Sequence, residues 1–173
     1  MADTNLMTAL FKSREDAEGA YQELLNRGYT QDDVSVLMSE DSRTNYYGDD
    51  AVNETALGNK AAEGTGVGAA VGGTLGAVIA AIAAIGTSIA LPGLGLIVAG
   101  PIAAAFAGAG AGGLTGGLVG ALVGSGIPEE TAKSYETGLN AGGIVLGFRP
   151  KTEAEADEVK GVWNNYNGEV SYR

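Results

Sequence analysis

Apolar and polar residues alternate regularly near both ends of the chain, whereas the middle is apolar throughout. At the amino end, residues 6–11 form a short apolar run, and apolar residues then recur at helical spacing. Ser13 is suited to cap this helix and Gly28 to end it. Residues 34–38 alternate as in a half-buried strand. This end therefore predicts a β-α-β unit, and the polar, acidic residues 39–58 are typical of a linker.

A second β-α-β pattern occupies the carboxyl end, after one additional helix. Pro128 is suited to the first turn of that additional helix. Residues 144–148 are apolar enough for a central strand, and Thr152 is suited to cap the helix that follows, which buries Trp163 on its apolar side. Residues 169–172 then predict a last short strand.

Two such halves in one small chain predict an α+β fold, a ferredoxin-like antiparallel sheet of four strands with two helices on one face. The apolar middle is then an insertion between the second and third strands. Residues 1–58 make up the first half of the ferredoxin-like domain and the acidic linker, and residues 59–127 make up the insert. Residues 128–173 supply the connecting helix and the second half.

The middle of the chain carries no charge from residue 64 to residue 128, although 31 charged residues lie elsewhere. Nineteen of the 29 glycines fall within it, and many of them recur every fourth residue. These recurring positions are Gly64, Gly68, Gly72 and Gly76, and then Gly108, Gly112, Gly116, Gly120 and Gly124. The spacing is typical of a glycine zipper, in which one ridge of a helix lacks side chains.

The insert predicts a long α-helical hairpin. Its arms, residues 62–90 and 101–125, would be about 43 and 37 Å long. The tip between them is broken by Pro92, Gly93, Gly95, Gly100 and Pro101. Glycine costs about 1 kcal/mol relative to alanine in a helix, so nine regularly spaced glycines need a reason. Close approach of a second backbone is that reason, and we predict the nine glycines as helix-packing and oligomerisation positions.

The hairpin could lie in a membrane or be buried in a soluble assembly. Each arm is long enough to cross a hydrocarbon core of about 30 Å, and the absence of charge favours insertion into a membrane. Alanine and glycine drive insertion only weakly, however. The alternative is a soluble homo-oligomer, such as a ring, shell or filament, in which the hairpins bury one another. We therefore expect the cytoplasmic side of the inner membrane, with a soluble cytoplasmic assembly as the alternative.

Composition excludes several classes of function. The chain has no cysteine and no histidine, which removes disulfides, thiolate nucleophiles, the usual zinc ligands and imidazole catalysis. The net charge of −11 argues against nucleic acid and against electrostatic docking on anionic lipid. The amino terminus lacks the basic and apolar segments of a secretory signal, so we expect the protein to start in the cytoplasm.

Motifs for enzymatic chemistry are weak. Residues 108–113 match G-x-G-x-x-G, but no strand precedes them and alanine-rich helical sequence surrounds them. The acidic pairs Glu40 with Asp41 and Asp49 with Asp50 are typical of solvated loops, and the spacing of a calcium-binding EF-hand is absent. We expect no enzyme, cofactor, metal or small-molecule substrate; the predicted partners are other copies of the chain and a lipid membrane.

Two stretches carry a family resemblance. The run ALFKSREDAEGAYQELLNRGYTQDDVSVLM resembles the small domain of the bacterial general stress protein family. The run GPIAAAFAGAGAGGLTGGLVGALVGSGIPEETAKSYETGLNAGGIVLGF resembles longer members that carry a glycine-zipper insert. The resemblance implies a stress-associated protein and supplies no active site. Together these observations predict a non-enzymatic stress-associated protein that self-assembles through glycine-zipper helices, inserted in a membrane or, alternatively, in a soluble homo-oligomer.

Overall fold

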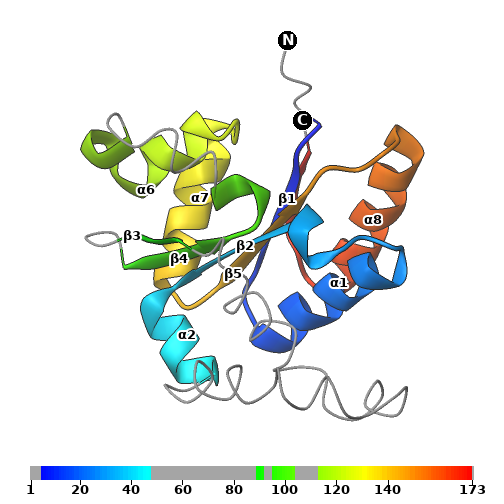
Figure 1. Cartoon of the computed structure of the whole chain (residues 1–173), viewed down its shortest axis with the longest axis horizontal. Helices are drawn as coiled ribbons and strands as arrows, with labels where there is room; N and C mark the ends of the chain where they lie inside the picture. The colour runs from blue at the N-terminus through cyan, green and yellow to red at the C-terminus, as the bar shows by residue number, and fades with distance from the viewer. Residues whose placement is uncertain (1–4, 48–88, 92–94, 104–112, 173) are drawn as a thin grey trace.

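The computed structural model describes residues 5–47, 89–91, 95–103 and 113–172, which form an α+β fold around one antiparallel sheet (Figure 1). The sheet has six strands in the order β3-β4-β2-β5-β1-β6. The strands are β1 (Met7–Phe11), β2 (Val34–Ser39), β3 (Ile89–Leu91), β4 (Leu96–Ala99), β5 (Ile144–Phe148) and β6 (Glu169–Tyr172). The helices are α1 (Arg14–Asn26), α2 (Glu40–Tyr47), α6 (Gly113–Gly124), α7 (Glu129–Asn140) and α8 (Glu153–Asn165), with a 3₁₀ turn at Gln31–Asp33.

The two ends of the chain form interlocked β-α-β units, as the sequence pattern predicts. In the first unit β1 and β2 lie on either side of β5, and in the second β5 and β6 lie on either side of β1. The registers are continuous, from Met7 opposite Phe148 to Phe11 opposite Ile144 in the β1–β5 pair. Each unit therefore depends on the other for its central neighbour, which explains why the halves form one sheet.

The predicted ends of the helices are confirmed by their hydrogen bonds. The Ser13 hydroxyl accepts from the Asp16 N–H at 3.1 Å, and the Thr152 hydroxyl accepts from the Glu155 N–H at the same distance. Gly28 has φ +87°, a left-handed conformation that suits glycine at a helix end. These local signals set where α1 and α8 begin and where α1 ends.

One face of the sheet is covered by α1 and α8, which lie on the same side in Figure 1. Trp163 of α8 is fully buried, and its ring lies edge-on to Phe11 at 5.7 Å and to Phe148 at 5.3 Å between centroids. Its indole N–H donates to the Ala20 carbonyl at 3.3 Å. The expectation that Trp163 anchors the last helix to the sheet is confirmed.

The opposite face is covered by α6 and α7, which Figure 1 places on the other side of the sheet. Tyr135 of α7 is buried there, and its hydroxyl donates to the Thr8 hydroxyl at 3.0 Å. Leu37 of β2 and Val145 of β5 belong to this second core. The prediction of a half-buried β2 was therefore wrong, because α7 and residues of the insert together bury the face expected to meet solvent.

The insert differs from the predicted helical hairpin in the part that the structure describes. Ile89–Leu91 and Leu96–Ala99 are strands, and β4 pairs antiparallel with β2, with Val36 opposite Ala99 and Ser39 opposite Leu96. Helical arms over 62–90 and 101–125 are thus wrong at residues 89–90 and at Gly117, where φ 63° and ψ −156° interrupt α6. The physical reason is the open edge of β2, whose backbone groups need partners that a helix cannot supply.

Two further outcomes concern the flanks of the insert. The stretch predicted as a linker begins with an ordered helix, α2, rather than with a loop. Pro128, expected in the first turn of a helix, is the N-cap residue of α7, and Glu129 and Glu130 lie in the first turn as expected. Within the described ranges, none of the helices combines the length and the apolar composition that crossing a bilayer requires.

Candidate functional site

The described charge-free residues after β4 lie close against the sheet. A Cβ on Gly100 would stand 2.3 Å from the Val34 carbonyl oxygen, and its φ of +84° also favours glycine. Just beyond it, the Ile102 N–H donates to the Ser35 hydroxyl at 3.0 Å in a buried position. Gly100 and Pro101, predicted as parts of a helical tip, instead carry the chain from β4 into a helical turn over the second core.

The helix α6 attaches the later part of the insert to the same core. Leu118, Ala121 and Leu122 are buried, whereas Val123 is 42% exposed. Ile127, just after the helix, is also buried, and its N–H donates to the Leu122 carbonyl at 3.1 Å. This part of the charge-free stretch therefore contributes to the core of its own chain.

The predicted glycine ridge is divided by this geometry. Gly116 precedes the non-helical Gly117, whereas Gly120 and Gly124 follow it on the next helical segment. Gly124 is exposed and Gly120 is half-buried. The remaining ridge glycines, which are Gly64, Gly68, Gly72, Gly76, Gly108 and Gly112, lie outside the described residues, as do Pro92 and Gly93 of the predicted tip. Gly95, also predicted for the tip, lies in the turn before β4 with φ +60°.

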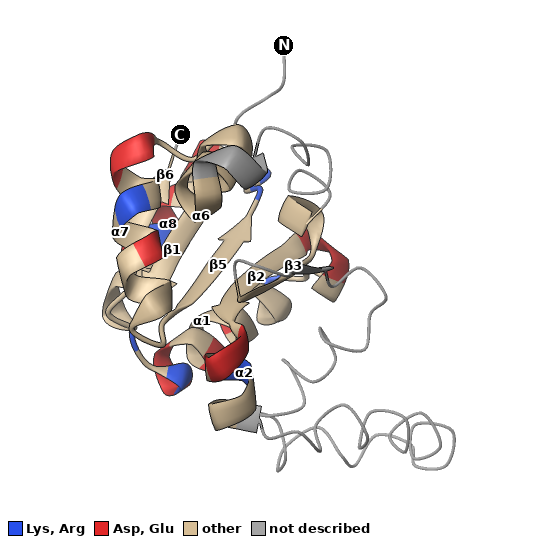
Figure 2. Ribbon diagram, turned by 90° about the vertical axis from the view of Figure 1, so that its left-hand side faces the viewer, with Lys and Arg blue, Asp and Glu red and all other residues tan. Residues whose placement is uncertain are grey.

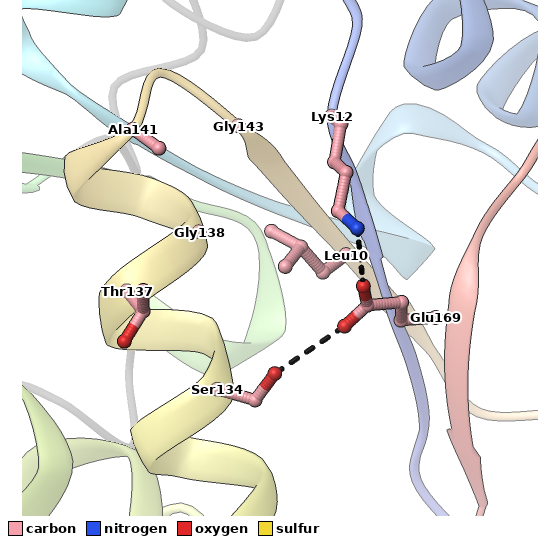
Figure 3. A pocket seen from close by; sticks show the side chains of 8 residues that line it. All are labelled: Leu10, Lys12, Ser134, Thr137, Gly138, Ala141, Gly143 and Glu169. Carbon is pink, nitrogen blue, oxygen red and sulfur yellow. Dashed lines mark hydrogen bonds and ion pairs between the residues drawn. The ribbon is translucent and has the colours of Figure 1, made fainter.

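A groove of about 450 Å³ lies between α7 and the β1–β6 side of the sheet (Figure 3). Eight residues line it: Leu10, Lys12, Ser134, Thr137, Gly138, Ala141, Gly143 and Glu169. A Cβ on Gly138 would stand 2.2 Å from Leu10 Cδ2, and one on Gly143 would stand 3.0 Å from Leu10 Cδ1. Because these two residues have no side chain, there is space for the Leu10 side chain next to them.

The polar side of this groove is organised by Glu169. Its carboxylate accepts from Lys12 Nζ at 2.8 Å and from the Ser134 hydroxyl at 3.3 Å (Figure 3). The hydrogen bond from Lys12 is the main cause that lowers the pKa of Glu169 below its ordinary value of 4.5. Because the Lys12 side chain is 74% exposed and that of Glu169 46%, solvent screens this pair strongly. The charges of Lys12 and Glu169 therefore offset each other at the rim of the groove, and the pKa of Glu169 is not raised toward neutral pH as that of a general acid would be.

The buried tyrosines likewise offer no reactive group. Burial is the largest cause that raises the pKa of Tyr21 and of Tyr29 to about 12, and it also raises the pKa of Tyr135. All three hydroxyls are consequently neutral at physiological pH. Among the described residues, no group of three or more carboxylates gathers as a metal site would require.

Of the two acidic pairs singled out in the sequence, the described pair Glu40 and Asp41 does not line the groove. Glu40 and Asp41 begin α2, where negative charge is stabilised by the helix dipole. Asp49 and Asp50 lie outside the described residues. No local motif in the sequence marks the groove, because Lys12 follows β1 whereas Ser134 lies on α7 and Glu169 on β6.

Comparison with known proteins gives no match: no family model, curated protein or solved structure matches this chain.

Proposed function

We propose that this chain is a non-enzymatic, stress-associated protein whose copies assemble through the glycine-rich insert. In this proposal a ferredoxin-like sandwich carries the insert, and the association with stress rests on the family resemblance described above. The order β2-β5-β1-β6, with α1 and α8 on one face, supports the ferredoxin-like assignment.

The need to bury residues 64–88 carries the proposal. These twenty-five residues have no charge and consist mainly of alanine, glycine, valine and isoleucine. Both faces of the sheet are already packed with helices of the described part of the chain. Large apolar surfaces mark interaction sites, and the same segment on other copies is a matching partner. The glycines at positions 64, 68, 72 and 76 would allow the close approach that such packing needs.

The attachment of the insert favours a soluble homo-oligomer. A hairpin that crossed a membrane with its arms at 62–90 and 101–125 would place its tip on the far side of the bilayer. The tip residues Leu96–Ala99 instead pair with β2, and α2 follows β2 directly in the chain. The segment between Tyr47 and Ile89 therefore connects a helix that directly follows β2 to a strand of the same sheet.

A membrane-inserted assembly is the second candidate. The observation that favours it is the uncharged composition of residues 64–88, which by length alone could reach across a hydrocarbon core if helical. In that case the protein would sediment with vesicles and would be released only by detergent. A soluble assembly would remain in the supernatant without detergent.

The test is the mass of the particle by light scattering, measured at several protein concentrations with and without detergent. We expect a defined multi-subunit particle in buffer alone, and a smaller particle for Gly72→Leu, because the new side chain separates the packed backbones. Gly161→Leu is the matched control, since Gly161 lies on α8 with open space where a Cβ would be.

Three results bear on the proposal in different ways. A wild-type chain that is monomeric at every concentration would contradict self-assembly. An unchanged particle in Gly72→Leu would show that residue 72 is not in a packing surface. Loss of mass in Gly161→Leu as well would mean that the variants act through general destabilisation, which circular dichroism of each variant would reveal.

A further inference from the structure

The strand β6 forms an edge of the sheet, opposite the edge formed by β3 (Figure 2). Within the described part of the chain, β6 pairs with β1 alone, from Leu10 opposite Glu169 to Met7 opposite Tyr172. An edge strand presents backbone N–H and C=O groups that have no ladder partner, and it can pair with a strand of another chain.

The side chains of β6 alternate between the two faces of the sheet. Val170 packs against the core under α1 and α8, and Tyr172, two residues further, projects to the same face. Tyr172 is 37% exposed, which makes it one of two large apolar side chains that are exposed among the described residues. Charged residues often protect an edge strand, but the Glu169 carboxylate is held on the groove side by Lys12 and Ser134 (Figure 3).

We propose that β6 pairs antiparallel with β6 of a second copy across a two-fold axis, with Ser171 opposite Ser171 of the partner subunit. This contact rests on the proposed self-assembly, to which it adds an interface that does not use the glycine-rich insert. It would join two six-stranded sheets edge to edge.

Symmetry and the pleat select this register. A two-fold axis perpendicular to the sheet keeps each face on its own side, and residues directly opposite each other project to the same face. In such a pair of β6 strands, a residue can therefore lie opposite only a residue of the partner strand whose number is the same as its own or differs from it by an even number. Of the two registers with the greatest overlap, one centres on Val170 and leaves Tyr172 exposed. The other centres on Ser171 and places Tyr172 opposite Val170 of the partner subunit, an aromatic and β-branched pair that stabilises sheets.

The contact is small, so it is weak by itself. Three residue pairs bury far less than the roughly 1,200 Å² of a stable interface, and two chains of net charge −11 repel each other. An assembly held together by the insert raises the effective concentration of the two edges, which allows a weak contact to form. No pair of like charges is directly opposed in the proposed register.

A cysteine cross-link tests the register directly. The chain contains no cysteine, so Ser171→Cys introduces one thiol without background. Directly opposite residues of antiparallel strands have Cβ atoms about 4.5–5.5 Å apart, close enough for a disulfide after small adjustment. On mild oxidation of the full chain we expect a disulfide-linked dimer. Asn165→Cys, on the exposed end of α8, should cross-link at least tenfold more slowly.

The outcomes separate this proposal from the proposed function. A large wild-type particle in which Ser171→Cys and Asn165→Cys cross-link equally slowly would overturn the β6 contact and leave assembly through the insert intact. A monomeric wild type would overturn both.

A charge exchange supplies a second measurement that does not depend on oxidation. Ser171→Lys and Ser171→Glu each place like charges opposite each other, so the particle of each variant alone should dissociate at a higher protein concentration than the wild-type particle. Mixing the two variants should restore the stability of the particle, because unlike charges then face each other. If the mixture behaves as the average of its components, β6 is not the contact.

Discussion

The attachment of α6 to the sandwich can be tested by removing one buried side chain, in the variant Leu122→Ala. Leu122 is fully buried in the core between α6, α7 and the second face of the sheet. Its neighbour Val123 lies on the same helix and is 42% exposed. The pair thus offers a perturbation and a control in one turn of helix.

The expected loss follows from burial. A leucine-to-alanine change at a fully buried position costs about 2–5 kcal/mol, which combines lost transfer free energy with the cavity that remains. For a chain of this size that loss corresponds to a fall in melting temperature of roughly 4–20 °C. Val123→Ala should change the free energy of unfolding by about 0.5 kcal/mol or less, as is usual for exposed positions.

Urea unfolding followed by tryptophan fluorescence is the assay, with all variants at one protein concentration because assembly affects apparent stability. The single tryptophan, Trp163, belongs to α8 and packs against the other face of the sheet. It therefore reports whether the layer built by the insert unfolds together with the rest of the sandwich. If the two variants have equal midpoints, or if Leu122→Ala leaves the Trp163 transition unchanged, then α6 is not part of the cooperative core.

Further predictions concern the groove, the control helix and the titrating groups. Gly138→Ala should cost about 1–3 kcal/mol in urea unfolding because the new methyl group meets the leucine of the groove floor, whereas Gly161→Ala, in open space, should stabilise by up to about 1 kcal/mol. Equal effects would refute the close contact. The lowered pKa of Glu169 means that its pair with lysine stabilises the fold above pH 4.5 and that this contribution is lost as the pH falls through the folded pKa. The stability difference between wild type and Glu169→Gln should therefore shrink below pH 4.5, and a difference independent of pH would contradict it. Absorbance titration should show that Tyr21 and Tyr29 remain protonated until about pH 12, while stability falls between about pH 10 and 12 because the unfolded chain ionises first. Their ionisation near pH 10 in the folded protein would contradict their burial.

Local patterns were sufficient to predict the two ends of the chain. At α1 and α8 the capping residues, the helical period of apolar side chains and the glycine turns act within a few residues of each other. Nothing distant is needed to recognise them. The buried position of Trp163 could be predicted for the same reason, since it lies on the apolar stripe of an amphipathic helix.

The candidate site could be predicted only in part. The recurring glycines are visible in the sequence, but their four-residue spacing does not reveal that Gly117 interrupts the helix that carries three of them. The strand at residues 169–172 could be predicted, but neither its position at the edge of the sheet nor the groove has a local signal in the sequence. Lys12 and Glu169 meet because β1 and β6 are neighbours in the sheet, and Ser134 joins them because α7 packs over β1.

By itself, the sequence determined the β-α-β units, their caps and the existence of an uncharged insert. It could not determine how that insert folds, because a run in which nearly every residue is apolar or glycine has neither the period of a helix nor the alternation of a strand. Long-range contacts in the tertiary structure determine which parts of the insert form strands and which form helices. The open edge of β2 exchanges backbone hydrogen bonds with Leu96–Ala99, and the uncovered face of the sheet gains apolar contacts from Leu118 and Leu122. Both are long-range effects, and both place part of the insert on the sheet rather than in a separate helical hairpin.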